Sequence, residues 1–309
     1  MRRIQREIST SRLSWPIAAL LTLIFWFIAW LEDHTSVSAF VLLMATGLLM
    51  MWINHLFALI KVFSRMIASS YLAFTTALII TPDIGNLQLR AVFVQLCLVS
   101  FLILFFSCYQ YRKAQGIILY AFLMIGIASL FFKQILFFVP LFWVLTGYCM
   151  VTMSAKILLS SIFGIILPYV FVVPYYLIKG LPFAEQTLLQ NWEFCKVFDF
   201  SEISPFLLVS FMSATMLSLV GIFHLLSDGH KDKVRIRMMY QIFIFIALLA
   251  FLLGLLQPTH LAEYTAIQLI SVSAMVGHFY AMTNTKYTNY TFITITAATY
   301  LLTIFNLTQ

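Results

Sequence analysis

Three consecutive polar residues, Glu32, Asp33 and His34, follow the first long apolar run of the sequence. Neighbouring carboxylates can act as a general base or hold a metal ion, so Glu32 and Asp33 are the candidate catalytic residues. A polar turn that joins two helices explains the same three residues without any chemistry. The sequence alone leaves both interpretations open.

Basic residues at the ends of apolar runs form a second candidate group, and Arg90 and Lys133 are its main members. A cation at the membrane interface can bind a lipid phosphate or another anionic head group. Arg90 and Lys133 are therefore the candidate substrate-binding residues. The alternative for Lys133 is that its stem stays in the apolar region while its ammonium reaches water.

Polar side chains also occur inside apolar runs, namely Asn54, Gln95, Glu263, Gln268 and His278. Such groups are costly at membrane depth and usually face a cavity or a polar partner. A transporter would need them to converge near mid-depth, and a proton relay would use the ionisable ones. The alternative places Glu263 and His278 at the two membrane interfaces, where they need no function.

Signatures of bound cofactors and of familiar catalytic centres are missing from the sequence. It contains no Walker-type loop, no GxSxG, no HExxH and no GxGxxG. The four cysteines have no CxxC spacing, so they indicate neither zinc nor dithiol chemistry. We predict no metal site and no cofactor.

The composition identifies the elements that must position these residues as membrane helices. Apolar residues make up 62% of the chain and charged residues 9%, whereas soluble domains carry roughly 25% charged residues. Runs of roughly 20 apolar residues are long enough to cross a bilayer. We predict an all-α transmembrane bundle in a single domain, residues 1–309, with about eleven spans (range nine to eleven): 14–31, 37–60, 67–81, 91–109, 115–132, 135–153, 157–178, 205–226, 238–256, 262–282 and 290–307.

The distribution of Lys and Arg predicts the orientation of this bundle. With the amino terminus in the cytosol, only four of the 18 fall in external segments, namely Arg90, Lys133, Lys179 and Lys196. This bias places the carboxy terminus outside and the protein in the inner membrane. It also explains the net charge of +7 without a nucleic-acid partner, because no single basic face exists.

Two connections are distinctive. Segment 179–204 is the longest external loop, and its apolar residues have the partly helical spacing of an amphipathic helix in the interface. Segment 227–237 is the main cytosolic loop, and we expect its charges of both signs to be solvated.

Part of the chain resembles a known family. Phe131-Phe132, Phe138-Val139-Pro140, Trp143, Lys156, Gly164 and Pro168-Tyr169 resemble an uncharacterised family of polytopic inner-membrane proteins of Bacteroidota. Members often have prolines at the hairpin turn, where this chain has Lys133-Gln134. The resemblance implies an inner-membrane location and no particular activity.

A weaker local likeness concerns the acid pair. Glu32 and Asp33, in the first external loop, are similar to the acids of membrane glycosyltransferases that use polyprenyl-phosphate sugars. This chain departs from that family in its short first loop and in lacking a large external carboxy-terminal domain. The likeness implies an enzyme that acts on a lipid-linked donor at the outer face.

Three functions stay open at this point. The chain could be an enzyme for a lipid-linked or amphipathic substrate, a transporter of a small molecule, or a non-catalytic partner in an envelope assembly. Membrane lipids are the predicted partners in each case, and the sequence does not identify a protein partner or decide whether the chain is an enzyme.

Overall fold

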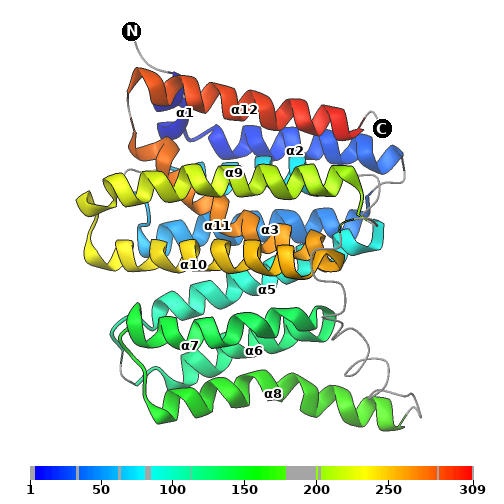
Figure 1. The fold of residues 1–309 in the computed structure, drawn as a ribbon, viewed down its shortest axis with the longest axis vertical. Coiled ribbons are helices and arrows are strands. Elements are labelled where there is room, and N and C mark those ends of the chain that lie inside the picture. The colour runs from blue at the N-terminus through cyan, green and yellow to red at the C-terminus, as the bar shows by residue number, and fades with distance from the viewer. Residues whose placement is uncertain are drawn as a thin grey trace.

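The computed structural model describes most of the chain: residues 4–32, 35–61, 64–80, 85–111, 113–178, 200, 203–283 and 285–307. Within these ranges all regular structure is helical (Figure 1). Asp33, His34 and nearly all of the predicted external loop 179–204 lie outside the described residues. The predictions made for them therefore stay predictions.

Each of the eleven predicted apolar runs corresponds to a helix. The helices are α2 (Ser14–Leu31), α3 (Val37–Phe57), α4 (Met66–Ile79), α5 (Gly85–Ser107), α6 (Gln115–Phe131), α7 (Val139–Tyr148), α8 (Ala155–Ile178), α9 (Pro205–Asp228), α10 (Val234–Leu256), α11 (Leu261–Met282) and α12 (Lys286–Leu307). Among the described residues, eight helices are long and apolar enough to cross a membrane, while α4, α6 and α7 are shorter. The chain is thus an integral membrane protein with several spans.

Short helices occupy several connections. Helix α1 (Ile4–Thr10) precedes the first span, and the 3-10 helices η1 (Lys133–Phe138), η3 (Gly229–Lys231) and η4 (Pro258–His260) lie between longer helices. The predicted tight turn at Lys133 is confirmed, because α6 ends at Phe131 and η1 begins two residues later.

Neighbouring helices run side by side and reverse direction at each connection (Figure 1). The turns at Lys61 and Asp232 share one end of the bundle, which we call the Lys61 end. Arg90, near the start of α5, and His260, in the turn before α11, share the other end, the Arg90 end. Helix α1 lies at the Lys61 end of the bundle, and α12 ends at the Arg90 end (Figure 1).

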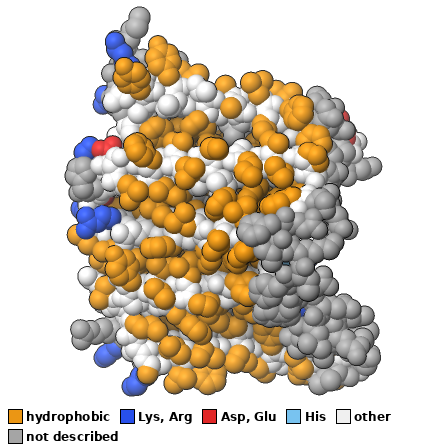
Figure 2. Space-filling view, in the orientation of Figure 1, with side chains coloured by type: hydrophobic (Ala, Val, Ile, Leu, Met, Phe, Trp, Pro, Cys, Tyr) orange, Lys and Arg blue, Asp and Glu red, His pale blue; other side chains and the backbone are white. Residues whose placement is uncertain are grey.

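Apolar side chains cover much of the outer surface, as a surface in contact with lipid requires. Figure 2 shows them spread over the long sides of the helices, while Lys and Arg side chains gather along the edge that corresponds to the Lys61 end. The exposed Ile17, Leu20 and Leu23 of α2 and Phe163 and Phe171 of α8 illustrate this arrangement.

Helix α11 forms the centre of the larger part of the bundle. It packs against α4, α5, α9 and α10, and every residue from Leu261 to Tyr280 is buried. At its Lys61 end, Gln5 of α1 donates from Nε2 to the carbonyl oxygen of Tyr280, at 2.9 Å. This bond satisfies a carbonyl that has no partner inside the helix.

Glycines bring α6 and α8 into close contact. A Cβ at Gly164 would lie 2.5 Å from the carbonyl oxygen of Leu119, and one at Gly126 would lie 2.7 Å from that of Ile165. Small residues allow the two helices to approach this closely. In lipid, such close packing holds helices together, because there is no hydrophobic driving force between them. Trp143 of α7 joins the same unit through a 2.9 Å hydrogen bond from Nε1 to Ser161 Oγ.

Candidate functional site

The polar side chains predicted at membrane depth are concentrated along α11. A helix surrounded by protein can carry polar groups that a lipid-facing helix cannot, because neighbouring helices supply partners. Of the eight long helices described, α11 with its preceding turn is the least apolar and the most buried. The candidate site is therefore this helix and the side chains that contact it.

At the Arg90 end, a buried ion pair joins α5 to α11. The Arg90 guanidinium contacts Glu263 Oε1, and the Glu263 side chain is fully buried whereas that of Arg90 is 32% exposed. His260, one turn before Glu263, lies 2.7 Å from Gln134 Nε2 through its own Nε2. Arg90 thus connects a buried carboxylate to the surface of the bundle.

This end also contains buried polar atoms that lack a hydrogen-bond partner among the described residues. They are Glu263 Oε2, His260 Nδ1, Arg90 Nε and Gln88 Oε1. Such atoms are costly when nothing satisfies them.

Near the middle of α11, uncharged groups from three helices meet its backbone and side chains. Gln95 of α5 donates from Nε2 to the carbonyl oxygen of Ala266, at 2.8 Å, and accepts from the Tyr71 hydroxyl, at 2.7 Å. Gln268 donates from Nε2 to Thr215 Oγ1 of α9, at 3.3 Å. Of the three residues that a transporter would need to converge, Gln95 contacts α11 and Gln268 lies on it.

At the Lys61 end, two histidines and a carboxylate form a chain of contacts. His224 Nε2 lies 3.2 Å from His278 Nδ1, and His278 Nε2 lies 3.2 Å from Asp232 Oδ2. Lys61 Nζ contacts the other oxygen of Asp232 at 2.9 Å. A carboxylate only accepts, so a proton on His278 Nε2 would face Asp232, although the two atoms are not aligned as a hydrogen bond. In that tautomer His278 Nδ1 accepts from His224 Nε2.

His224 can bind one more proton, at its second ring nitrogen. With His224 donating from Nε2, its Nδ1 is bare and lies 3.7 Å from Asp228 Oδ2, beyond hydrogen-bond distance. Protonation of Nδ1 would give it a carboxylate partner on the exposed side of the cluster. His224 and His278 therefore lie between the exposed Asp228 and the buried Asp232, a line of groups that we call the relay.

The burial of the Asp232 side chain contradicts the prediction for the cytosolic loop. Its side chain is only 3% exposed, so the prediction that the charges of segment 227–237 are solvated is wrong for this residue. Burial raises the pKa of its carboxyl, but the contacts with His278 and Lys61 together outweigh burial and lower the pKa to about 2. Asp232 therefore stays ionised as the anchor of the relay.

Asp232 should make folding stability depend on pH in a narrow acid range. A carboxyl whose pKa falls from 3.8 to about 2 on folding stabilises the protein fully above its unfolded pKa, and that stabilisation disappears as the pH falls through the folded pKa. We expect Asp232→Asn to cost roughly 2 kcal/mol at neutral pH. Its melting temperature should converge on that of the wild type between about pH 4 and pH 2, and parallel curves would contradict the prediction.

The structure brings two of the predicted site residues to one end of α11 and places Glu32 at the end of another helix. It brings Arg90 and the Lys133-Gln134 turn to the same end of α11, since Gln134 bonds His260 and Arg90 pairs with Glu263. Glu32 is exposed at the end of α2, a helix that packs against α3, α4 and α12. Asn54 lies at the Lys61 end, where it holds a turn instead of facing Gln95 and Gln268.

Sequence reasoning missed His224, Tyr71 and the partner of Glu263. His224 lies in an apolar run near the loop that contains Asp228 and Asp232, and this proximity was the available signal. The pairings of Tyr71 with Gln95 and of Arg90 with Glu263 gave none, because the partners are 24 and 173 residues apart in the sequence.

The comparisons with known proteins leave the arrangement to be interpreted by its own chemistry: no protein-family model, no curated protein and no solved structure matches this chain.

Proposed function

We propose that this chain is an inner-membrane transporter that couples the movement of a small solute to that of protons along α11. The observation that carries the proposal is that α11 is buried throughout, yet has Glu263 at one end and the His224–His278–Asp232 relay at the other. Packing alone does not require ionisable residues at these positions, because an apolar residue such as leucine would fill the same space. Ionisable residues inside a membrane bundle mark proton or ion pathways.

The topology that accompanies this proposal has eleven spans, with the amino terminus in the cytosol. Eleven helices alternate in direction, and the basic residues Lys61, Arg65, Lys231 and Arg235 share the Lys61 end, which the positive-inside bias assigns to the cytosol. In this orientation Arg90 and Glu263 face the periplasm.

The proposed cycle has two proton-binding ends. A proton enters beside Arg90 and binds Glu263, which releases Arg90 from its ion pair. At the other end, a proton leaves from His224 Nδ1 to the carboxylate of Asp228. Fifteen residues separate Glu263 from His278, about 22 Å of helix at 1.5 Å per residue, so no single proton transfer joins them. The cycle therefore requires α11 and its neighbours to change their packing, as in alternating access.

The test uses the purified protein in proteoliposomes that contain a pH-sensitive dye. We impose a pH gradient and add amino acids, sugars, nucleosides and organic anions one at a time. A transported solute should collapse the gradient faster in proteoliposomes than in empty vesicles. Failure of every solute class to alter the gradient, with correctly folded and inserted protein, would contradict the proposal.

An enzyme acting on a lipid-linked donor at the outer face is the second candidate. Arg90 and Lys133, its proposed phosphate-binding residues, lie at the same end of α11, which supports this function. Asp33→Asn distinguishes the two candidates in the same proteoliposomes. An enzyme that uses Asp33 as a base would lose turnover of the donor, whereas the proposed transporter would keep its solute-dependent proton flux.

A further inference from the structure

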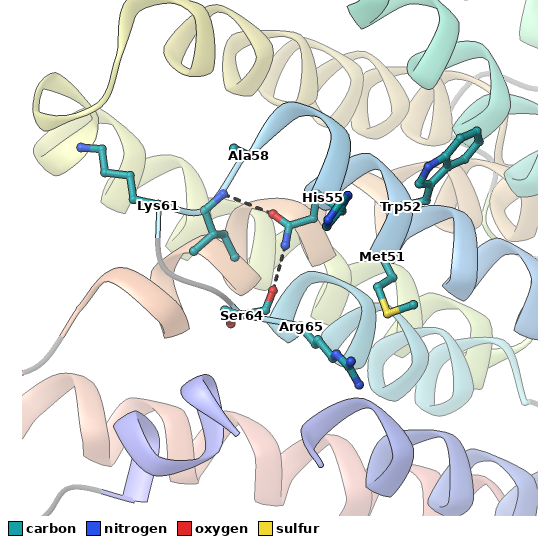
Figure 3. A pocket seen from close by; sticks show the side chains of 9 residues that line it. Met51, Trp52, His55, Ala58, Lys61, Ser64 and Arg65 are labelled. Carbon is teal, nitrogen blue, oxygen red and sulfur yellow. Dashed lines mark hydrogen bonds between the residues drawn. The ribbon is translucent and has the colours of Figure 1, made fainter. Parts of the chain in front are cut away.

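A cavity of about 470 Å³ opens at the Lys61 end, and Lys61 is the lining residue that also contacts Asp232. It lies between the end of α3 and the start of α4, and Figure 3 shows its lining. The wall contains Met51, Trp52, His55, Ser64 and Arg65. Cationic and donor groups therefore share one hollow with large apolar side chains.

The turn that shapes this cavity is held by Asn54. Its Nδ2 donates to the carbonyl oxygen of Ser64, at 2.8 Å, and its Oδ1 accepts from the Ile60 amide, at 3.2 Å (Figure 3). Ala58 ends α3 with a φ of 48°, a left-handed conformation that a non-glycine residue rarely adopts. The hollow is consequently a built feature of the turn between α3 and α4.

The cations Lys61 and Arg65 of this cavity differ in whether a carboxylate compensates their charge. Lys61 pairs with Asp232, and in Figure 3 its side chain points away from the other labelled side chains. Arg65 donates from Nη1 to the Arg12 carbonyl oxygen, at 3.0 Å, which is a neutral partner. A guanidinium has five N–H donors, so Arg65 keeps both its charge and donors for an anion.

The apolar part of the cavity continues onto the outer surface of α3. Trp52 is 52% exposed, and Leu48 and Leu56, one turn to either side, are exposed as well. Tryptophan is enriched where the head groups of a membrane meet its hydrocarbon. The hollow thus joins a cationic group to a surface that faces acyl chains.

We infer that this cavity binds an anionic phospholipid, whose phosphate contacts Arg65 and His55 and whose glycerol and acyl region contacts Trp52 and Met51. Basic pockets on the cytosolic side of membrane helices recognise anionic head groups. Free phosphate would use only the cationic part of the site, so the exposed apolar strip favours a lipid. This inference is independent of the proposed transport.

The test measures lipid binding to the full-length protein by native mass spectrometry in detergent. Phosphatidylglycerol should bind more tightly than phosphatidylcholine, and Arg65→Gln should weaken its binding about fivefold. Trp52→Ala should weaken both lipids and reduce quenching of protein fluorescence by brominated phosphatidylglycerol. Arg237→Gln, which removes an exposed cation of α10, is the matched control and should leave binding unchanged.

Three outcomes would overturn the inference. Equal affinity for the two lipids, or an equal loss in Arg65→Gln and Arg237→Gln, would show that charge at this cavity does not select the ligand. Displacement of the lipid by millimolar inorganic phosphate would identify a soluble anion as the occupant. Because Arg65 also bonds Arg12, His55→Ala provides a second variant, and unchanged binding in both would refute the site.

Discussion

Replacing Arg90 by alanine should destabilise the protein more than any other single loss of charge. The substitution leaves the fully buried carboxylate of Glu263 without its cation. Breaking a buried ion pair from one side costs about 3–5 kcal/mol, because the remaining charge stays desolvated. We expect Arg90→Ala to lower the melting temperature strongly, measured in detergent by fluorescence-detected size-exclusion chromatography after heating.

Glu263→Gln is the matched variant for this experiment. It should cost less than Arg90→Ala, because Arg90 is partly exposed and can turn toward water while Glu263 cannot. The double variant Arg90→Ala, Glu263→Gln should recover much of the stability lost in Arg90→Ala alone. Additive losses in the double variant would contradict the buried pair.

A side chain at Gly164 should produce the second large effect. Its Cβ would lie 2.5 Å from the Leu119 carbonyl oxygen and 3.1 Å from the Leu123 nitrogen, both backbone atoms of α6. Backbone cannot rotate aside, so α8 must move away from α6. Overpacking costs typically about 1–3 kcal/mol, and we expect Gly164→Val to reach the upper end of this range. The melting temperature and the yield of monodisperse protein measure the loss.

Gly116 provides the control in the same helix pair. A Cβ there would meet nothing within 4 Å, so Gly116→Ala should be neutral or slightly stabilising, since alanine favours helix over glycine by about 1 kcal/mol. Equal behaviour of the variants at Gly164 and Gly116 would show that α6 and α8 do not pack through these glycines.

Most of the fold could be predicted because lipid imposes a simple length rule. Runs of apolar residues located the eleven helices α2 to α12, and the interruption at Lys133-Gln134 divided the stretch 115–153 into α6 and α7. Helix ends were less accurate: α10 begins at Val234, four residues before the predicted span, because Arg235 and Arg237 can reach water from a helix.

The candidate site was only partly predictable. Glu263, Gln268 and His278 stood out because polar residues in an apolar run need partners, and all three are buried on α11. Their partners could not be identified from one sequence, since the order of helices in a bundle does not follow from hydropathy. Asp232 looked like an ordinary loop residue, and only its contacts with Lys61 and His278 show that it is buried.

The candidate residues were chosen for two different physical reasons. Glu32 and Asp33 were chosen for chemical type at a helix end, which is also the composition of a plain polar turn. Arg90 was chosen because it violates the orientation bias, and the structure gives that violation a cause in the buried Glu263. The roles predicted for Glu32, Asp33, Arg90 and Lys133 stay predictions.

Proton flux through Glu263→Gln proteoliposomes tests the central claim most directly, that α11 carries protons. With a solute that collapses the pH gradient in the wild type, we predict at least about a tenfold slower collapse in Glu263→Gln, because an amide cannot bind and release the proton. Glu7→Gln, an exposed acid of α1, should keep the wild-type rate. Equal proton flux in Glu263→Gln and the wild type would contradict the account.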